Sequence, residues 1–191
     1  MRKSLLIVLL AASAAYAQHP ITFEDLASIH RIGAPQVSPD GQWIAYSTST
    51  PDLAANKSNS AVFILPAAGG APRKIADGSS PAWSPDGKTL AFIKDNQVYL
   101  MNGAPASAGQ PAKAGAPLQG GAASVKFMPN GIGVVVVSDI YPDCGVDPTC
   151  IKDKTTAAEK KPSSARIITS LLYRHWRSWQ APTRFGSTAG I

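Results

Sequence analysis

The sequence is poor in charged residues, in cysteine and in long apolar segments. Charged side chains make up 16% of the 191 residues, against about 25% in an average soluble protein. This shortage excludes a long charged helix and an acidic disordered tail. Beyond the N-terminal segment, no apolar run approaches the roughly 20 residues that cross a bilayer as a helix. We therefore expect no membrane span after that segment.

Motifs of catalysis and of nucleotide binding are also missing. The sequence has no Walker loop, no dinucleotide-binding glycine pattern and no H-E-x-x-H zinc motif. It has no G-x-S-x-G nucleophile elbow, because the serine in segment 186–190 directly follows the glycine. His19, His30 and His175 have no serine and aspartate in the order of a catalytic triad. We expect no catalytic residue, no metal site and no cofactor in this chain.

The N-terminus has the pattern of an export signal. Arg2 and Lys3 precede a short apolar run at 5–12, and Ala15-Tyr16-Ala17 fits a small-x-small cleavage site. The pattern predicts a signal peptide over residues 1–17, removed before Gln18, and a periplasmic or secreted product. A buried N-terminal helix is the alternative interpretation.

Export changes the interpretation of the two cysteines, Cys144 and Cys150. Gly145 and Pro148 lie between them in a loop that can close, and an oxidising compartment keeps a disulfide formed. A Cys-x5-Cys spacing without a nearby histidine does not fit a zinc site. The sequence therefore predicts a disulfide that fixes one local loop.

A short amphipathic helix is predicted over residues 23–31. Thr22 stands at its N-cap and Asp25 at the third helical position, as in a capping box. The helix should end before Gly33 and Pro35. Its apolar face should dock on another part of the protein, and it consists of Phe23, Leu26 and Ile29.

The main pattern is a turn sequence that occurs three times. Its prolines are 46 and 44 residues apart, within the roughly 40–50 residues expected for one four-stranded propeller blade. Proline presets φ, aspartate bonds its own backbone, and glycine adopts the left-handed conformation, so each copy should join two antiparallel strands. Because the aspartates recur at one structural position, we interpret them as turn residues and not as a catalytic pair. The turn residues are Ser38, Pro39, Asp40 and Gly41; Ser84, Pro85, Asp86 and Gly87; and Pro129, Asn130 and Gly131.

Further apolar runs between the turns complete about four short strands in each period. The predicted fold is mostly β: a partial β-propeller of about three blades with WD40-like or TolB-like repeats. It includes one short N-terminal helix and a helical basic segment near the C-terminus. The predicted organisation is a signal peptide at 1–17, a helix and lead-in at 18–35, blades at 36–140, a disulfide loop with a basic helical insertion at 141–179, and an atypical tail at 180–191.

Basic residues dominate the last part of the chain. From Lys152 onward there are eight basic residues and two acidic ones, Asp153 and Glu159. Such an excess can mark an acidic partner or nucleic acid, but export argues against nucleic acid, and a solvated linker explains the composition. A helix is expected from about residue 153, and the apolar residues of segment 167–172 continue at helical spacing.

Taken together, these features resemble exported bacterial serine peptidases of the prolyl oligopeptidase family. The nearest branch is that of dipeptidyl-peptidase IV and acylaminoacyl-peptidase. The resemblance covers residues 22–179. It is carried by the helix that leads into the first Ser-Pro-Asp-Gly turn, by the later turns, and by Tyr141-Pro142-Asp143-Cys144 followed by Leu171-Leu172-Tyr173-Arg174-His175-Trp176 and Trp179.

The resemblance implies an N-terminal propeller that caps a C-terminal α/β-hydrolase domain and helps to select short peptides. This chain would hold the first blades, without the hydrolase domain and without any triad residue. Segment 180–191 does not look like the next strand, which suggests a frameshift or a premature stop. An incomplete propeller would leave a blade edge exposed and favour self-association.

Two other interpretations stay open. A non-catalytic TolB-like periplasmic binding module shares the turn sequence but needs more blades, because propellers usually close with four to eight. A small free-standing β-sandwich is the second alternative. The repeat period and the single helix at the start argue against it.

Overall fold

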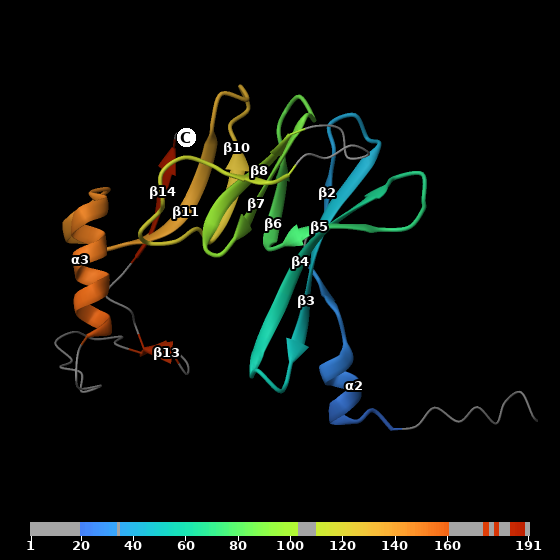
Figure 1. The fold of residues 1–191 in the computed structure, drawn as a ribbon, viewed down its shortest axis with the longest axis horizontal. Helices are drawn as coiled ribbons and strands as arrows, with labels where there is room; N and C mark the ends of the chain where they lie inside the picture. Colours follow the sequence, from blue (N-terminus) through green and yellow to red (C-terminus); the bar gives the residue numbers. More distant parts are fainter. Residues whose placement is uncertain are drawn as a thin grey trace, which may run out of the picture.

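The computed structural model describes residues 20–33, 35–102 and 110–160, and the backbone of the strands at 174–175, 178–179 and 184–189. Three antiparallel sheets lie side by side, with α3 beyond one end of the row and α2 below the other end (Figure 1). The expectation of a mostly β protein built from antiparallel sheets is confirmed. Among the described residues, neither helix is long and apolar enough to cross a membrane.

The first sheet is built on a long hairpin. Its strands are β1 (Arg31–Ile32), β2 (Gln36–Val37), β3 (Trp43–Asp52), β4 (Lys57–Pro66) and β5 (Arg73–Asp77). β1 and β2 both pair with β3. β3 also pairs with β4, and β4 pairs with β5. The first sheet therefore includes a strand, β1, that lies in the segment expected as a lead-in.

The second sheet has the order β6 (Ser79–Trp83), β7 (Thr89–Lys94), β8 (Gln97–Asn102) and β9 (Ala112–Lys113). The third sheet has the order β10 (Ser124–Phe127), β11 (Val134–Ile140) and β14 (Arg184–Ala189). In each sheet, one of the three turn sequences joins two neighbouring strands: β2 to β3, β6 to β7, and β10 to β11. We call the strands before the turns, β2, β6 and β10, the inner strands.

Alternation along the strands gives each sheet two faces, and facing sides of neighbouring sheets form two cores. Between the first and second sheets, the buried side chains are Ala45, Val62, Ile64, Leu90, Phe92 and Met101. Between the second and third sheets, the core contains Ala91, Ile93 and Val98 on one side and Val125, Val134 and Val136 on the other. β7 therefore serves both cores, because successive side chains of a strand point to opposite faces.

The N-terminal helix is shorter than predicted. α2 spans Phe23–Ser28, with the expected capping box between Thr22 and Asp25. It ends at Ser28 because Ile29 is extended and the chain then pairs with β3 as β1. The predicted stop at Gly33 was wrong. Gly33 instead donates its N–H to the Ser47 carbonyl at 2.7 Å, where a Cβ would collide with the Ser47 side chain.

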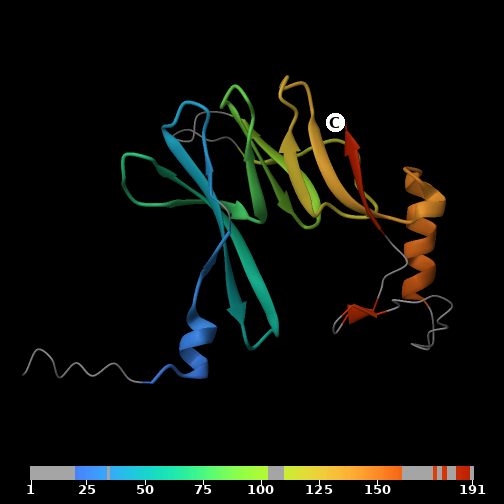
Figure 2. The ribbon, with the colours of Figure 1, turned by 180° about the vertical axis from the view of Figure 1, so that it is seen from behind.

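The apolar face of α2 does not dock on the described part of the protein. Phe23, Leu26 and Ile29 are 64%, 52% and 51% exposed. Figure 2 shows from behind that α2 lies beside the far end of the β3–β4 hairpin and away from the cores. The expectation of a buried helical face was therefore wrong for the described residues.

The C-terminal part also differs from prediction. α3 spans Pro148–Glu159 and begins about five residues earlier than expected, because Asp147 caps the Thr149 N–H and Pro148 occupies the first turn. The predicted helical spacing at 167–172 lies outside the described residues. Farther on, β12 (Arg174–His175) and β13 (Ser178–Trp179) pair as strands, where the sequence indicated a helical insertion.

The segment expected as an atypical tail contains a strand. β14 pairs antiparallel with β11 from Val135 to Ile140, so it forms the third strand of the third sheet. Its sequence, Arg-Phe-Gly-Ser-Thr-Ala, has weak β-propensity. The pairing comes instead from the free edge of the valine-rich β11, a tertiary contact that the local sequence does not announce.

We expect Phe92→Ala to lower the free energy of unfolding by about 3–5 kcal/mol, the usual cost of removing a buried aromatic side chain. Phe92 is fully buried between the first two sheets. Urea unfolding monitored by tryptophan fluorescence measures the change. Ile132→Ala, at a side chain that is 82% exposed, should change stability by about 0.5 kcal/mol or less. Equal effects of the two substitutions would contradict the assigned core.

Candidate functional site

The first two turns have the same pattern of hydrogen bonds. The Ser38 hydroxyl donates to Asp40 Oδ1 at 2.5 Å and accepts from the Trp43 N–H at 2.9 Å. The Ser84 hydroxyl does the same with Asp86 at 2.6 Å and with the Thr89 N–H at 2.9 Å. Both serine side chains are buried. Each hydroxyl therefore donates one hydrogen bond and accepts another within its own turn, which is a structural role.

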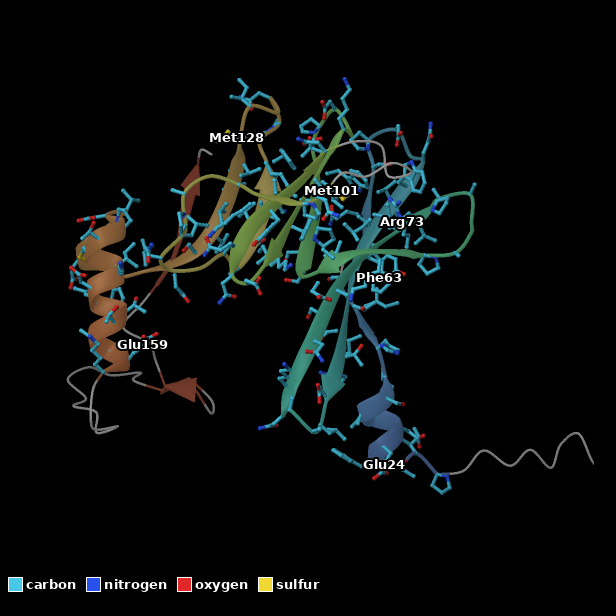
Figure 3. All side chains as sticks on the ribbon, viewed as in Figure 1. Glu24, Phe63, Arg73, Met101, Met128 and Glu159 are labelled. Carbon is cyan, nitrogen blue, oxygen red and sulfur yellow. A yellow bond between two sulfur atoms is a disulfide. The ribbon has the colours of Figure 1, made fainter. Side chains whose placement is uncertain are left out.

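The third turn keeps the backbone but changes the side chains. The Met128 N–H donates to the Gly133 carbonyl, and the Gly131 N–H donates to the Met128 carbonyl, both at 2.9 Å. Met128, labelled in Figure 3, stands where the other turns have serine. Asn130 Oδ1 still accepts from the Ile132 N–H at 3.1 Å. The third turn therefore lacks the serine hydroxyl bridge and keeps the contact of an Asx turn.

The hydrogen bonds of the first two turns lower the pKa values of the Asp40 and Asp86 carboxyl groups. The Ser38 hydroxyl, followed by the Gln42 N–H, holds the pKa of Asp40 below its ordinary value of 3.8. The Ser84 hydroxyl, followed by the Lys88 N–H, lowers the pKa of Asp86 in the same way. Hydrogen bonds to the charged form of a carboxyl have this effect. Both carboxylates are solvent-exposed and stay ionised at neutral pH.

The inner strands of the three sheets line a groove with a volume of about 540 Å³. β2, β6 and β10 supply most of its wall, and Gly33 and Ser47 also line it. We name it the inner-strand groove. Its lining combines apolar side chains with several serines, and Lys126 is the one charged residue among the described residues that line it. Such a surface can bind an extended chain, and its described lining contains no histidine or carboxylate.

Trp83 fixes the junction of the first two sheets at this groove. Its indole Nε1–H donates to the Gln36 carbonyl at 3.1 Å, which ties β6 to β2. Nearby, the register of β6 against β7 shifts between Ser79 and Ala82, and Ser80 takes a positive φ of 53°. A non-glycine residue in this conformation is uncommon. The bulge bends β6 where it lines the groove.

The predicted disulfide between Cys144 and Cys150 is present, with the two Cα atoms 5.5 Å apart. It joins the short helix η2 (Pro142–Cys144) to the first turn of α3. Lys154 Nζ contacts Asp143 Oδ2 at 2.6 Å and lies 5.5 Å from the centre of the Tyr141 ring. These contacts hold α3 against segment 141–144, which directly follows β11.

Other candidate residues do not form a catalytic or metal site in the described part of the chain. His30 Nδ1 lies 2.6 Å from the Thr50 hydroxyl at the side of the β3–β4 hairpin, away from the inner-strand groove. His19 and the His175 side chain lie outside the described residues. Within the described ranges, no group of histidine, cysteine and acidic side chains is placed to hold a metal ion.

Sequence reasoning found the turns but did not find the inner-strand groove. A signal was present in the residue that precedes each turn: Val37, Trp83 and Phe127 occupy one structural position and all line the groove. In the sequence these three positions are distinguished only as aromatic or β-branched residues beside the turns. Only the packing of three inner strands side by side shows that they share one surface.

The Asp40→Asn/Asp86→Asn double variant should lose less stability in acid than the unchanged protein. A lowered pKa in the folded state stabilises the fold above the ordinary aspartate value, and this contribution is lost as the pH falls through 3.8 toward the lowered pKa. An amide keeps the acceptor, as Asn130 shows, but does not titrate. Thermal unfolding midpoints from pH 6 to pH 2 measure the effect. Asp153→Asn is the control, and an unchanged acid dependence in the double variant would refute the assignment.

Comparison with known proteins supports the family suggested by the sequence. No protein-family profile matches the chain. Dipeptidyl-peptidase 5 of Porphyromonas endodontalis is 28% identical over 165 residues, and dipeptidyl-peptidase 5 of Porphyromonas gingivalis is 32% identical over 172 residues. Each alignment covers 83% of this chain and 23% of the relative. The chain therefore spans about a quarter of the length of these curated relatives.

Among solved structures, the AtxE2 isopeptidase without ligand superposes with a TM-score of 0.52 and 14% identity. The match covers 89% of this chain and 30% of the isopeptidase. At this identity the similarity concerns the fold alone. The superposed region includes most of the described sheets. From the two dipeptidyl-peptidase relatives and the repeated turn architecture, we conclude that the chain belongs to the prolyl oligopeptidase family, as N-terminal propeller sequence of a peptidase.

Proposed function

We propose that the chain is the substrate-gating propeller portion of a periplasmic or secreted serine peptidase that acts on short peptides. In this proposal, each of the three sheets is one blade, and the inner-strand groove forms part of the passage toward a C-terminal α/β-hydrolase domain. The observation that carries the proposal is that β2, β6 and β10, from three different sheets, line one groove. Similarity to two dipeptidyl-peptidases over most of the chain supports it.

The proposed role is binding and gating, without catalysis by this chain. The serine hydroxyls of the turns already hydrogen-bond to an aspartate and to a backbone N–H. His30 is bonded to Thr50. The nucleophile, acid and base of the proposed peptidase would therefore belong to the hydrolase domain.

A TolB-like periplasmic binding module is the second candidate function. The same groove favours it, because a surface with apolar and hydroxyl groups binds a peptide whether or not a hydrolase is attached. The DNA that follows the coding segment discriminates between the candidates. An open frame with a G-x-S-x-G motif and a later histidine supports the peptidase, whereas further Ser-Pro-Asp-Gly copies followed by a stop support the binding module.

The chain by itself should not hydrolyse a chromogenic dipeptide substrate. The proposal assigns the triad to a domain outside this sequence, so the expected rate equals that of buffer. Release of the chromophore measured with and without a serine-directed inhibitor is the test. Turnover that the inhibitor abolishes would show a catalytic site within this chain and would overturn the gating role.

Export is part of the proposal, and the disulfide between Cys144 and Cys150 supports it because such bonds persist in oxidising compartments. Expression in a Gram-negative host should deliver the protein to the periplasm with Gln18 as its first residue. N-terminal sequencing of the periplasmic fraction checks this. Replacing Arg2 and Lys3 with glutamate should keep the protein in the cytoplasm, and periplasmic delivery of that variant would argue against the signal.

A further inference from the structure

The third turn contains an asparagine followed by a glycine, the dipeptide in which asparagine most readily loses its side-chain amide. In this reaction the backbone nitrogen of the following residue attacks the side-chain carbonyl, and glycine leaves the attack unhindered because it has no side chain. Asn130 and Gly131 form such a pair, and the structure describes both residues. Asn102 also precedes a glycine, but that glycine lies outside the described residues.

The third turn is accessible to water. Asn130 and Gly131 are both exposed. Asp86 occupies the equivalent position of the second turn and is exposed too, although the second sheet is packed on both faces. The exposure therefore comes from the position at the tip of a turn and does not depend on what covers the faces of the third sheet.

The first two turns are poor sites for the same reaction. They have aspartate where the third turn has Asn130. Hydrogen bonds from a serine hydroxyl and a backbone N–H lower the pKa of Asp40 and of Asp86, so both carboxyl groups are ionised at neutral pH. An ionised carboxylate resists attack by a nucleophile, whereas the neutral amide of Asn130 does not.

Two hydrogen bonds of the closed third turn oppose the reaction. The attacking atom would be the Gly131 nitrogen, whose N–H donates to the Met128 carbonyl at 2.9 Å. The carbonyl under attack is that of the Asn130 side chain, whose Oδ1 accepts from the Ile132 N–H at 3.1 Å. Ring closure requires both bonds to break. The turn has no serine hydroxyl to add a further bond, because Met128 stands at that position.

We propose that Asn130 is a site of spontaneous deamidation and that opening of the third turn controls its rate. Proteins open locally at turns and strand ends at a far lower free energy than they unfold as a whole. Each opening frees the Gly131 nitrogen and the Asn130 side chain together. The site is therefore protected in the closed turn and reactive in the open one.

The chemistry needs only water. The Gly131 nitrogen loses its proton and bonds to Asn130 Cγ, and the Cγ–Nδ2 bond breaks as the leaving group takes up a proton and departs as ammonia. The product is a succinimide ring, which water opens at either of its two carbonyl groups. Opening at Cγ gives aspartate. Opening at the main-chain carbonyl gives isoaspartate, in which the chain runs through Cβ and Cγ.

The two products differ in their effect on the third sheet. Aspartate fits the turn, because Asp40 and Asp86 precede glycines with a φ of 71° and Gly131 has a φ of 70°. Isoaspartate adds one atom to the main chain between β10 and β11. The register that places Val134 and Val136 in the core depends on the length of this turn.

Peptide mapping by mass spectrometry tests the proposal on the full chain in mildly alkaline buffer. It measures conversion of amide to acid at each asparagine, and an isoaspartyl methyltransferase labels the isoaspartate. A synthetic peptide of residues 126–134 in the same buffer is the reference without a closed turn. We expect Asn130 to react about tenfold or more slowly in the folded chain, because reaction there requires a local opening. Guanidinium should remove the difference between chain and peptide.

Replacing Met128 provides the matched pair of variants. Met128→Ser restores the hydroxyl that in the first turn donates to Asp40 Oδ1 and accepts from the Trp43 N–H, so it should slow deamidation of Asn130 by a few-fold. Met128→Ala removes the same side chain without adding a hydroxyl and should not slow it. Circular dichroism establishes that both variants are folded. The comparison of chain and peptide tests the proposal by itself if either variant unfolds.

Thermal unfolding distinguishes the products. Asn130→Asp should unfold at the same temperature as the unchanged chain at neutral pH. The isoaspartate form, separated by chromatography, should unfold at a lower temperature. An isoaspartate form as stable as the unchanged chain would refute the predicted effect on the register.

Three results would overturn the proposal: equal rates in the folded chain and the peptide, no conversion in the peptide, or folded Met128→Ser and Met128→Ala variants that react alike. None of them bears on the gating function, which is tested by the downstream reading frame and by peptide hydrolysis.

Discussion

Burial of one sheet face against the next is the constraint on which the rest of this structure depends. Phe92 stacks on Tyr99 and Leu90 pairs with Met101 within the second sheet, and the first sheet covers this face through Val62 and Ile64. Because apolar burial contributes roughly 25 cal/mol per Å², these contacts set the spacing of the sheets. The spacing of the sheets in turn aligns the inner strands, and the aligned strands form the groove.

The turns make this packing repeatable. In each of the three copies, a glycine at a φ near 70° reverses the chain, so the strand after the turn starts in the same register relative to the strand before it. A register error of one residue would move every core side chain to the opposite face. The buried serines of the first two turns stabilise that register, and the third turn keeps it with its backbone alone.

The sequence was informative where local chemistry decides the structure. Turn residues, the capping box at Thr22 and the disulfide all follow from short-range geometry, and the structure shows the last two as expected. Long-range pairing could not be predicted in the same way. β1 shortens α2 by pairing with β3, and β14 joins β11 from a glycine- and serine-containing segment. The groove was missed for a similar reason, since its wall comes from three separated strands.

The placement of β14 has a consequence for how the chain folds. The β2–β3, β6–β7 and β10–β11 hairpins involve contacts close in sequence, which form early because little loop entropy opposes them. β14 contacts β11 only after segment 141–183 has closed a loop. In a chain that emerges from a ribosome or a translocation pore, the edge of β11 stays unpaired until that loop closes. Until β14 pairs, another chain can capture this edge.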